Sequence, residues 1–184
     1  MRFLLVLIIL VILGAGAFLF GGFYNVAATA PDPAFVVSAL ERIRAASIDR
    51  HATEQPPATL ALDSPAVVQD GARAFATRGC INCHGGPGAN WAKFSEGLSP
   101  GPPDLKDVAP TMEPRELFWV IKNGINMTGM PSFGGIDVPD REIWTIVAFV
   151  KKLPSVSDAD FKTWTSAAPA ATAAPAAPAP AKAP

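Results

Sequence analysis

The sequence has few of the residues that build disulfide scaffolds or zinc clusters. Its 184 residues include two cysteines, two histidines and one tyrosine. A four-ligand zinc site would have to recruit carboxylates from distant positions, because only His51 and His84 accompany the cysteines.

Charge is also scarce, and Arg2 is the only charged residue before Asp32. Without Arg2, 14 of the 15 Lys+Arg remain against 16 Asp+Glu, a balance of −2. There is no basic stripe, so a nucleic-acid partner is not expected.

Both cysteines belong to one motif, Cys80-Ile81-Asn82-Cys83-His84, which has the pattern C-x-x-C-H. Two thiols at this spacing can each form a thioether bond to a vinyl group of the same porphyrin, and the histidine that follows is then held beneath the iron. A redox-active disulfide uses the same cysteine spacing, but it normally belongs to a βαβ pattern that is not visible here. The motif favours one covalently attached haem c, with a redox pair and a zinc site as the alternatives.

The N-terminus is a long apolar run, from Phe3 to Phe20, without charged or strongly polar residues. About 20 such residues in a helix cross the ~30 Å hydrocarbon core of a membrane. A cleaved signal would normally have a shorter apolar region, and Pro31 directly follows the small-residue stretch at 28–30. We therefore predict an uncleaved transmembrane anchor at residues 1–24. Arg2 favours an N-terminus in the cytoplasm, with the rest of the chain outside.

Residues 25–64 are interpreted as a tether with a short helix from Phe35 to about Arg50, which either packs on the following domain or lies on the membrane surface. The domain itself is expected at 65–154, beginning with a helix over 66–77. Gly71 inside that helix predicts a close approach of another helix, for which Asp140–Leu153 is the candidate. A third helix is expected after Pro114.

The remaining segments of the domain are predicted to be loops. The stretch from Gly85 to Pro103 is rich in glycine and proline, and residues 127–131 form a second loop. After the domain, residues 155–184 are expected to be a disordered tail, and its last part is almost entirely alanine and proline.

A haem iron also needs a ligand on the side opposite His84. The candidates are Met112, Met127, Met130 and His51. Pro131 forces Met130 towards an extended conformation, and Gly129 lets the backbone approach a flat ligand closely. Met127 has neither neighbour, so the residues favour Met130, with core packing as the alternative role of any methionine.

Taken together, several motifs resemble class I (mono-haem) cytochromes c. They are Gly71-x-x-x-Phe75, the C-x-x-C-H motif with Gly85, Pro102-Pro103-Asp104-Leu105, Asn123-Gly124 and Gly129-Met130-Pro131. The resemblance covers about residues 65–153. It implies an all-α cytochrome c-like domain around one haem, whose first and last helices cross.

The resemblance also implies roles for individual residues. His84 and Met130 would be the axial ligands of the iron. The backbone carbonyl of Pro103 would hold the other nitrogen of His84, and Leu105 would pack on the haem. Trp119 would either lie near a propionate or simply pack in the core.

These observations lead to one functional hypothesis. The chain is interpreted as a membrane-anchored cytochrome c of the bacterial inner membrane, with its haem domain in the periplasm. It would carry single electrons between partners such as a quinol-oxidising complex, a terminal oxidase or a dehydrogenase, and it would not itself be an enzyme. A mildly acidic surface would suit a partner with a basic patch. The alternatives are a sensor or peroxidase-like protein with a labile distal ligand, and an electron-wiring subunit of a larger oxidoreductase.

Overall fold

The computed structural model describes residues 1–166, and the chain divides into two compact units, Met1–Ile43 and a second that begins at Arg44. The first unit contains α1 (Arg2–Phe20), a helix of 19 residues with a mean hydropathy of 3.1 and no buried residue. Its length is about 28 Å at the usual helical rise, close to the thickness of a bilayer core. By length and composition α1 could cross a membrane. The helix expected near residues 35–50 is α2 (Ala34–His51).

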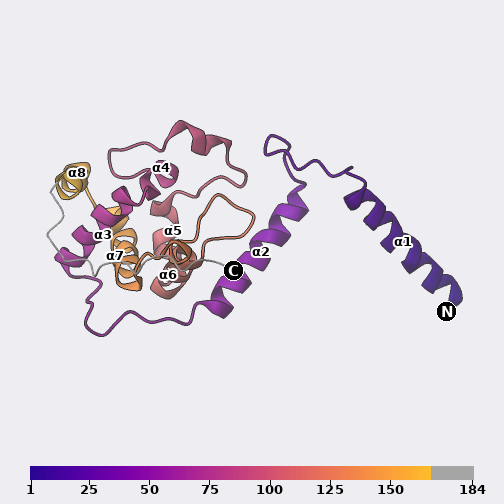
Figure 1. Cartoon of the computed structure of the whole chain (residues 1–184), viewed down its shortest axis with the longest axis horizontal. Helices are drawn as coiled ribbons and strands as arrows, with labels where there is room; N and C mark the ends of the chain where they lie inside the picture. The colour runs from indigo at the N-terminus through magenta and orange to yellow at the C-terminus, as the bar shows by residue number, and fades with distance from the viewer. Residues whose placement is uncertain (167–184) are drawn as a thin grey trace, which may run out of the picture. The chain divides into compact units, whose positions relative to one another are not determined.

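The second unit is built from helices and short 3-10 turns (Figure 1). Within residues 1–166 there is no β-strand, only an isolated bridge between Gly86 and Ala89. The all-α prediction is therefore confirmed. The remaining helices are α3 (Pro65–Thr77), α4 (Cys80–His84), α5 (Leu105–Thr111), α6 (Pro114–Asn123), α7 (Asp140–Lys152) and α8 (Asp158–Ser166). The 3-10 turns are η1 (Lys93–Gly97), η2 (Gly134–Ile136) and η3 (Leu153–Ser155).

The core is organised around the crossing of α3 and α7 (Figure 1). A Cβ atom at Gly71 would lie 1.9 Å from the carbonyl oxygen of Thr145, so only glycine allows the two backbones to meet. One helical turn away, the rings of Phe75 and Phe149 lie 5.2 Å apart. The close approach predicted from Gly71 is thus present, and its partner is the predicted last helix.

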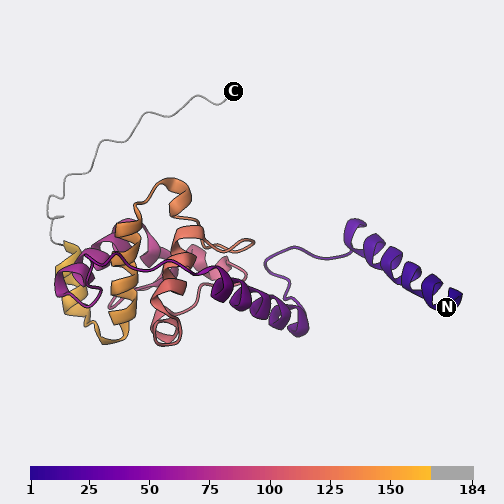
Figure 2. The ribbon, with the colours of Figure 1, turned by 90° about the horizontal axis from the view of Figure 1, so that it is seen from below.

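Helix α6 covers another side of α7, as Figure 2 also shows. The rings of Phe118 and Trp144 stack with centroids 4.1 Å apart and planes inclined by 11°. The first turn of α6 is closed by a capping box, in which Glu113 and Glu116 satisfy each other's backbone N–H groups. The capping box and the packing of Phe118 on Trp144 therefore both stabilise α6 in its position against α7.

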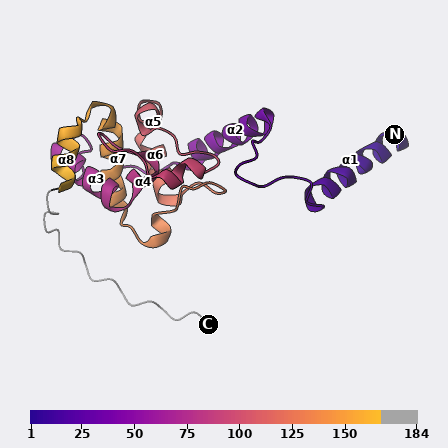
Figure 3. The same cartoon turned by 90° about the horizontal axis from the view of Figure 1, so that it is seen from above.

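Helix α8 (Asp158–Ser166) corrects the expectation of a disordered tail for the residues that it contains. Phe161 is buried and stacks on Phe149 with ring centroids 5.5 Å apart. The guanidinium of Arg73 donates to the carbonyl oxygen of Trp164, and Figure 3 shows α8 beside α3. A helix of nine residues is marginal in water, so burial of Phe161 against the core is what stabilises it. Residues 167–184, where the alanine and proline are concentrated, lie outside the described residues.

Candidate functional site

The C-x-x-C-H motif forms its own short helix, α4, directly after α3. Gly79 before it has φ 81° and Gly85 after it has φ 65°, both in the left-handed region that favours glycine. Cys80 and Cys83 are three residues apart on this turn, so their side chains project on the same side. The glycine at each end lets the chain enter and leave this helix sharply. Both thiols and His84 therefore belong to one short turn of five residues.

The two thiols differ from those of a redox disulfide or a zinc site. Both cysteines are free and half-buried. Burial raises the pKa of the Cys80 thiol to about 12, whereas redox-active C-x-x-C motifs lower the pKa of their reactive cysteine. Among residues 1–166, no group of three or more His, Cys, Asp or Glu side chains could hold a metal ion. The donor set therefore fits covalent attachment of a porphyrin better than the alternatives.

His84 is fixed by a single hydrogen bond. Its Nδ1 lies 3.0 Å from the carbonyl oxygen of Pro103, which can only accept, so Nδ1 must carry the proton. The lone pair of the neutral ring is then on Nε2, the nitrogen available to a metal. Burial lowers the pKa of His84 and so favours the neutral ring that a metal ligand requires. The hydrogen bond to Pro103 partly opposes this shift.

An open cleft lies beside this histidine. It is lined by Cys83, His84, Trp91, Ser95, Glu96 and residues 101–104. Pro103 thus shares the cleft with α4, which we call the haem-attachment turn because it carries the C-x-x-C-H motif. Trp91, Ser95 and Glu96 were missed, because they belong to the Gly/Pro-rich stretch whose path the sequence does not indicate.

Met130 lies in a loop that is tied together by its own hydrogen bonds. The Thr128 hydroxyl donates to the carbonyl oxygen of Ile125 at 2.7 Å, and the Met130 amide donates to that hydroxyl at 3.1 Å. The Ile125 amide in turn donates to the carbonyl oxygen of Met130 at 3.2 Å. A Cβ atom at Gly129 would lie 2.9 Å from Leu98, so this glycine admits a side chain of the opposite loop.

The alternative methionines have different environments. Met130 is half-buried and packs against the hydrophobic core, as does Met112. Met127 is 90% exposed and has a positive φ of 58°. The side chain of Met127 is therefore not held by surrounding residues, whereas that of Met130 is held by packing against the core.

Leu105 and Trp119 are not among the residues that line the cleft. Leu105 begins α5 and packs against the core while remaining half-buried. The half-buried ring of Trp119 lies next to that of His51, with centroids 6.1 Å apart and planes inclined by 28°. Nδ1 of His51 donates to the carbonyl oxygen of Ser47 at 2.7 Å. The structure therefore pairs Trp119 with His51, a contact that the sequence pattern does not indicate.

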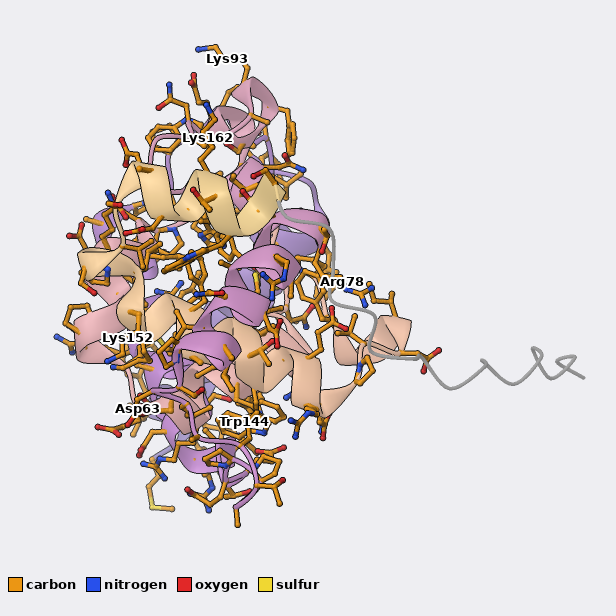
Figure 4. The ribbon with its side chains drawn as sticks, turned by 90° about the vertical axis from the view of Figure 1, so that its left-hand side faces the viewer. Asp63, Arg78, Lys93, Trp144, Lys152 and Lys162 are labelled. Carbon is orange, nitrogen blue, oxygen red and sulfur yellow. The ribbon has the colours of Figure 1, made fainter. Side chains whose placement is uncertain are left out.

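A bidentate ion pair holds the junction between α3 and α4. Arg78, labelled in Figure 4, donates from Nε and an Nη to the two carboxylate oxygens of Glu142, at 2.7 and 2.9 Å. Because Glu142 lies on α7, this pair connects the start of the haem-attachment turn to the helix that crosses α3.

The helical frame and the glycine-bounded C-x-x-C-H turn are the features expected of a c-type cytochrome domain. Residues 66–150 match the family model described as cytochrome C oxidase, cbb3-type, subunit III, which confirms that this part of the chain is a c-type cytochrome domain. Such a domain binds haem c covalently, and the single C-x-x-C-H motif provides for one haem. No curated protein and no solved structure matches the chain.

Proposed function

We propose that this protein is a membrane-anchored carrier of single electrons in a bacterial respiratory chain. The supporting observation is the position of the cytochrome domain, residues 65–154, after the apolar helix α1. We place the anchor at residues 1–24 in the inner membrane, the tether at 25–64 and the haem domain in the periplasm. The apolar side chains of α1 are all exposed in their own unit, as a membrane helix requires.

We further propose His84 and Met130 as the axial ligands of the iron. The Pro103 carbonyl fixes His84 in the tautomer whose Nε2 can bind a metal. The hydrogen-bonded loop from Ile125 to Met130 would present the thioether without rearrangement. When bound, haem supplies a reversible ferric/ferrous couple, and methionine ligation raises its potential. Cys80 and Cys83 would hold the porphyrin covalently, and Leu105 and Trp119 would contact it.

The ligand assignment is tested by replacing Met130 with alanine. We expect the reduction potential to fall and the ferric sulfur-to-iron absorption band to disappear, because the thioether favours ferrous iron. Met127→Ala is the matched control, since its side chain is almost fully exposed, and it should leave both unchanged. An unchanged spectrum in Met130→Ala would contradict the assignment. Ready binding of CO to the reduced wild type would favour the alternative with a labile distal ligand.

A second candidate is that the protein wires electrons within one oxidoreductase complex. The family description names a subunit of cytochrome C oxidase, which supports this candidate. The test is purification from membranes in mild detergent. A stable complex at fixed stoichiometry with an oxidase would support the subunit role, and recovery of the protein alone would support a tethered carrier.

A further inference from the structure

The loop between the haem-attachment turn and α5 holds two aromatic side chains in solvent. Phe94 is 63% exposed and is not among the residues that line the cleft beside His84, whereas Trp91 is 52% exposed and lines that cleft. We call these two residues the aromatic pair. They are three positions apart, so their Cα atoms are separated by at most about 11 Å. Two neighbouring exposed aromatic rings are typical of a protein–protein contact, where Trp, Tyr and Phe are enriched.

The loop that carries the aromatic pair is well anchored. The Ala92 amide donates to the carbonyl oxygen of Asn82 in the haem-attachment turn at 2.8 Å. Ser95 is buried, and its hydroxyl donates to the carbonyl oxygen of Ala92 at 2.8 Å. These two hydrogen bonds therefore hold the backbone of the segment that exposes Phe94. Figure 4 shows Lys93, next to Phe94, at one extremity of the domain.

The aromatic pair is also continuous with the proposed haem site. Trp91 lines the same cleft as Cys83 and His84. Further along the loop, Leu98 packs against Gly129, next to the proposed ligand Met130. The pair therefore lies on a segment that contacts both sides of the site, where a partner would have to come close for an electron to pass.

Charges on this segment are largely neutralised locally. Lys93 forms an ion pair with Glu96, and the same carboxylate accepts from the indole of Trp91 at 3.5 Å. Asp104, at the end of the segment, keeps its negative charge, because it accepts only from the neutral backbone amide of Lys106. Within residues 85–103 the only charged residues are Lys93 and Glu96, so the loop that carries the aromatic rings has no net charge to attract a strongly basic or strongly acidic surface.

From these observations we infer that Trp91 and Phe94 form the docking surface for a protein redox partner whose contact face is apolar and without net charge. This inference rests on the proposed electron-transfer function. It differs from the expectation of a basic patch on the partner, which came from the net charge of the whole chain. Association through such a face depends on burial of apolar surface and hardly on salt, whereas pairing of opposite charges weakens as salt rises.

The test measures how fast the reduced, full-length, haem-loaded protein is oxidised by detergent-solubilised membranes of the source organism. We expect Phe94→Ala to slow this reaction about tenfold below saturation, as loss of an interface anchor does. Ile136→Ala is the matched control, because Ile136 is 64% exposed in the 3-10 turn η2, outside this loop, and it should react at the wild-type rate. Raising NaCl from about 20 to about 500 mM should change the wild-type rate less than about twofold.

Two charge variants test the nature of the partner's face. Phe94→Lys and Phe94→Glu should both slow the reaction at least as much as Phe94→Ala, because either charge would be buried against an apolar face. Acceleration by one of them would show a charged partner face and overturn the inference. Equal rates for Phe94→Ala and Ile136→Ala would overturn it as well.

A lipid surface is the competing occupant of the aromatic pair. If Phe94→Ala is slow only in liposomes and normal in detergent, the pair contacts the bilayer, and the inference is wrong. Oxidation of Phe94→Ala by ferricyanide at the wild-type rate would show that the haem is intact in this variant. If the membranes fail to oxidise even the wild type, the proposed function fails, and that outcome is distinguishable from a failure of the docking surface.

Discussion

Nδ1 of His84 lies 3.0 Å from the carbonyl oxygen of Pro103, and this carbonyl immediately precedes the N-cap of α5. The cap is Asp104, whose carboxylate accepts from the Lys106 amide at 2.8 Å. The orientation of a metal-binding imidazole is therefore coupled to the capping of a neighbouring helix. Such outer contacts of a ligating histidine fix its tautomer and tune its basicity.

Asp104→Ala should loosen this arrangement. Loss of an N-cap costs about 1 kcal/mol of stability, and here it should also free the Pro103 carbonyl to move. We expect a lower free energy of unfolding together with faster solvent exchange of the His84 Nδ1 proton, measured by NMR. Asp107→Ala, in the first turn of the same helix, is the control and should affect the exchange rate much less. Equal exchange rates in the two variants would disprove the coupling.

Gly71→Ala should be strongly destabilising. The added Cβ atom would lie 1.9 Å from the carbonyl oxygen of Thr145, so α3 and α7 would have to separate. Overpacking of this kind costs about 1–3 kcal/mol or more. Gly97→Ala is the control, because a Cβ atom added there would meet no other atom within 4 Å, and it should be close to neutral. Chemical denaturation of both variants measures the difference, and similar midpoints would refute the prediction.

Phe161→Ala should show that α8 belongs to the domain. Removing a buried phenylalanine side chain costs about 3–5 kcal/mol, and here it would also remove the ring that stacks on Phe149. Lys162→Ala, at the next, exposed position, should cost little. Thermal unfolding followed by circular dichroism compares the two variants. A Phe161→Ala protein as stable as the wild type would mean that α8 is dispensable.

Stability of the haem-free chain should also fall as the solution becomes moderately acidic. In that chain, burial lowers the pKa of His84 from its ordinary value of 6.5, so the unfolded chain takes up this proton before the folded chain does. The stabilising effect is complete above that value and is lost as the pH falls below it, by at most about 1.4 kcal/mol per pH unit.

Denaturant titrations between about pH 7.5 and 5.5, above the range in which carboxylates titrate, would measure this slope. A His51→Gln variant leaves His84 as the only histidine and isolates its effect. Stability that stays flat or rises towards acid pH would contradict the prediction.

Much of the frame could be predicted because its signals are local. Gly71 indicated a close helix crossing, and the helices expected at 66–77 and 140–153 are α3 (Pro65–Thr77) and α7 (Asp140–Lys152). The C-x-x-C-H motif fixed the cofactor, which the family match confirms. In each case a few neighbouring residues determine the outcome, so the sequence pattern carries the information.

The missed features depend on contacts between residues that are far apart in the sequence. Helix α8 is too short to be stable without Phe149, a residue contributed by another helix. The path of the loop from Gly85 to Pro103 depends on contacts such as Ala92 with Asn82 and Leu98 with Gly129. The pairing of His51 with Trp119 likewise joins two helices that no local pattern connects.

The haem-attachment turn buries none of its five residues, and a left-handed glycine stands at each of its ends. Its entry and exit are therefore set by the local backbone, while Cys80 and Ile81 pack against the hydrophobic core. A five-residue helix is not stable in an unfolded chain, so the turn keeps its shape only when the core has formed around it or when a cofactor joined to both thiols closes it. Until one of these happens, the two thiols are free to move apart.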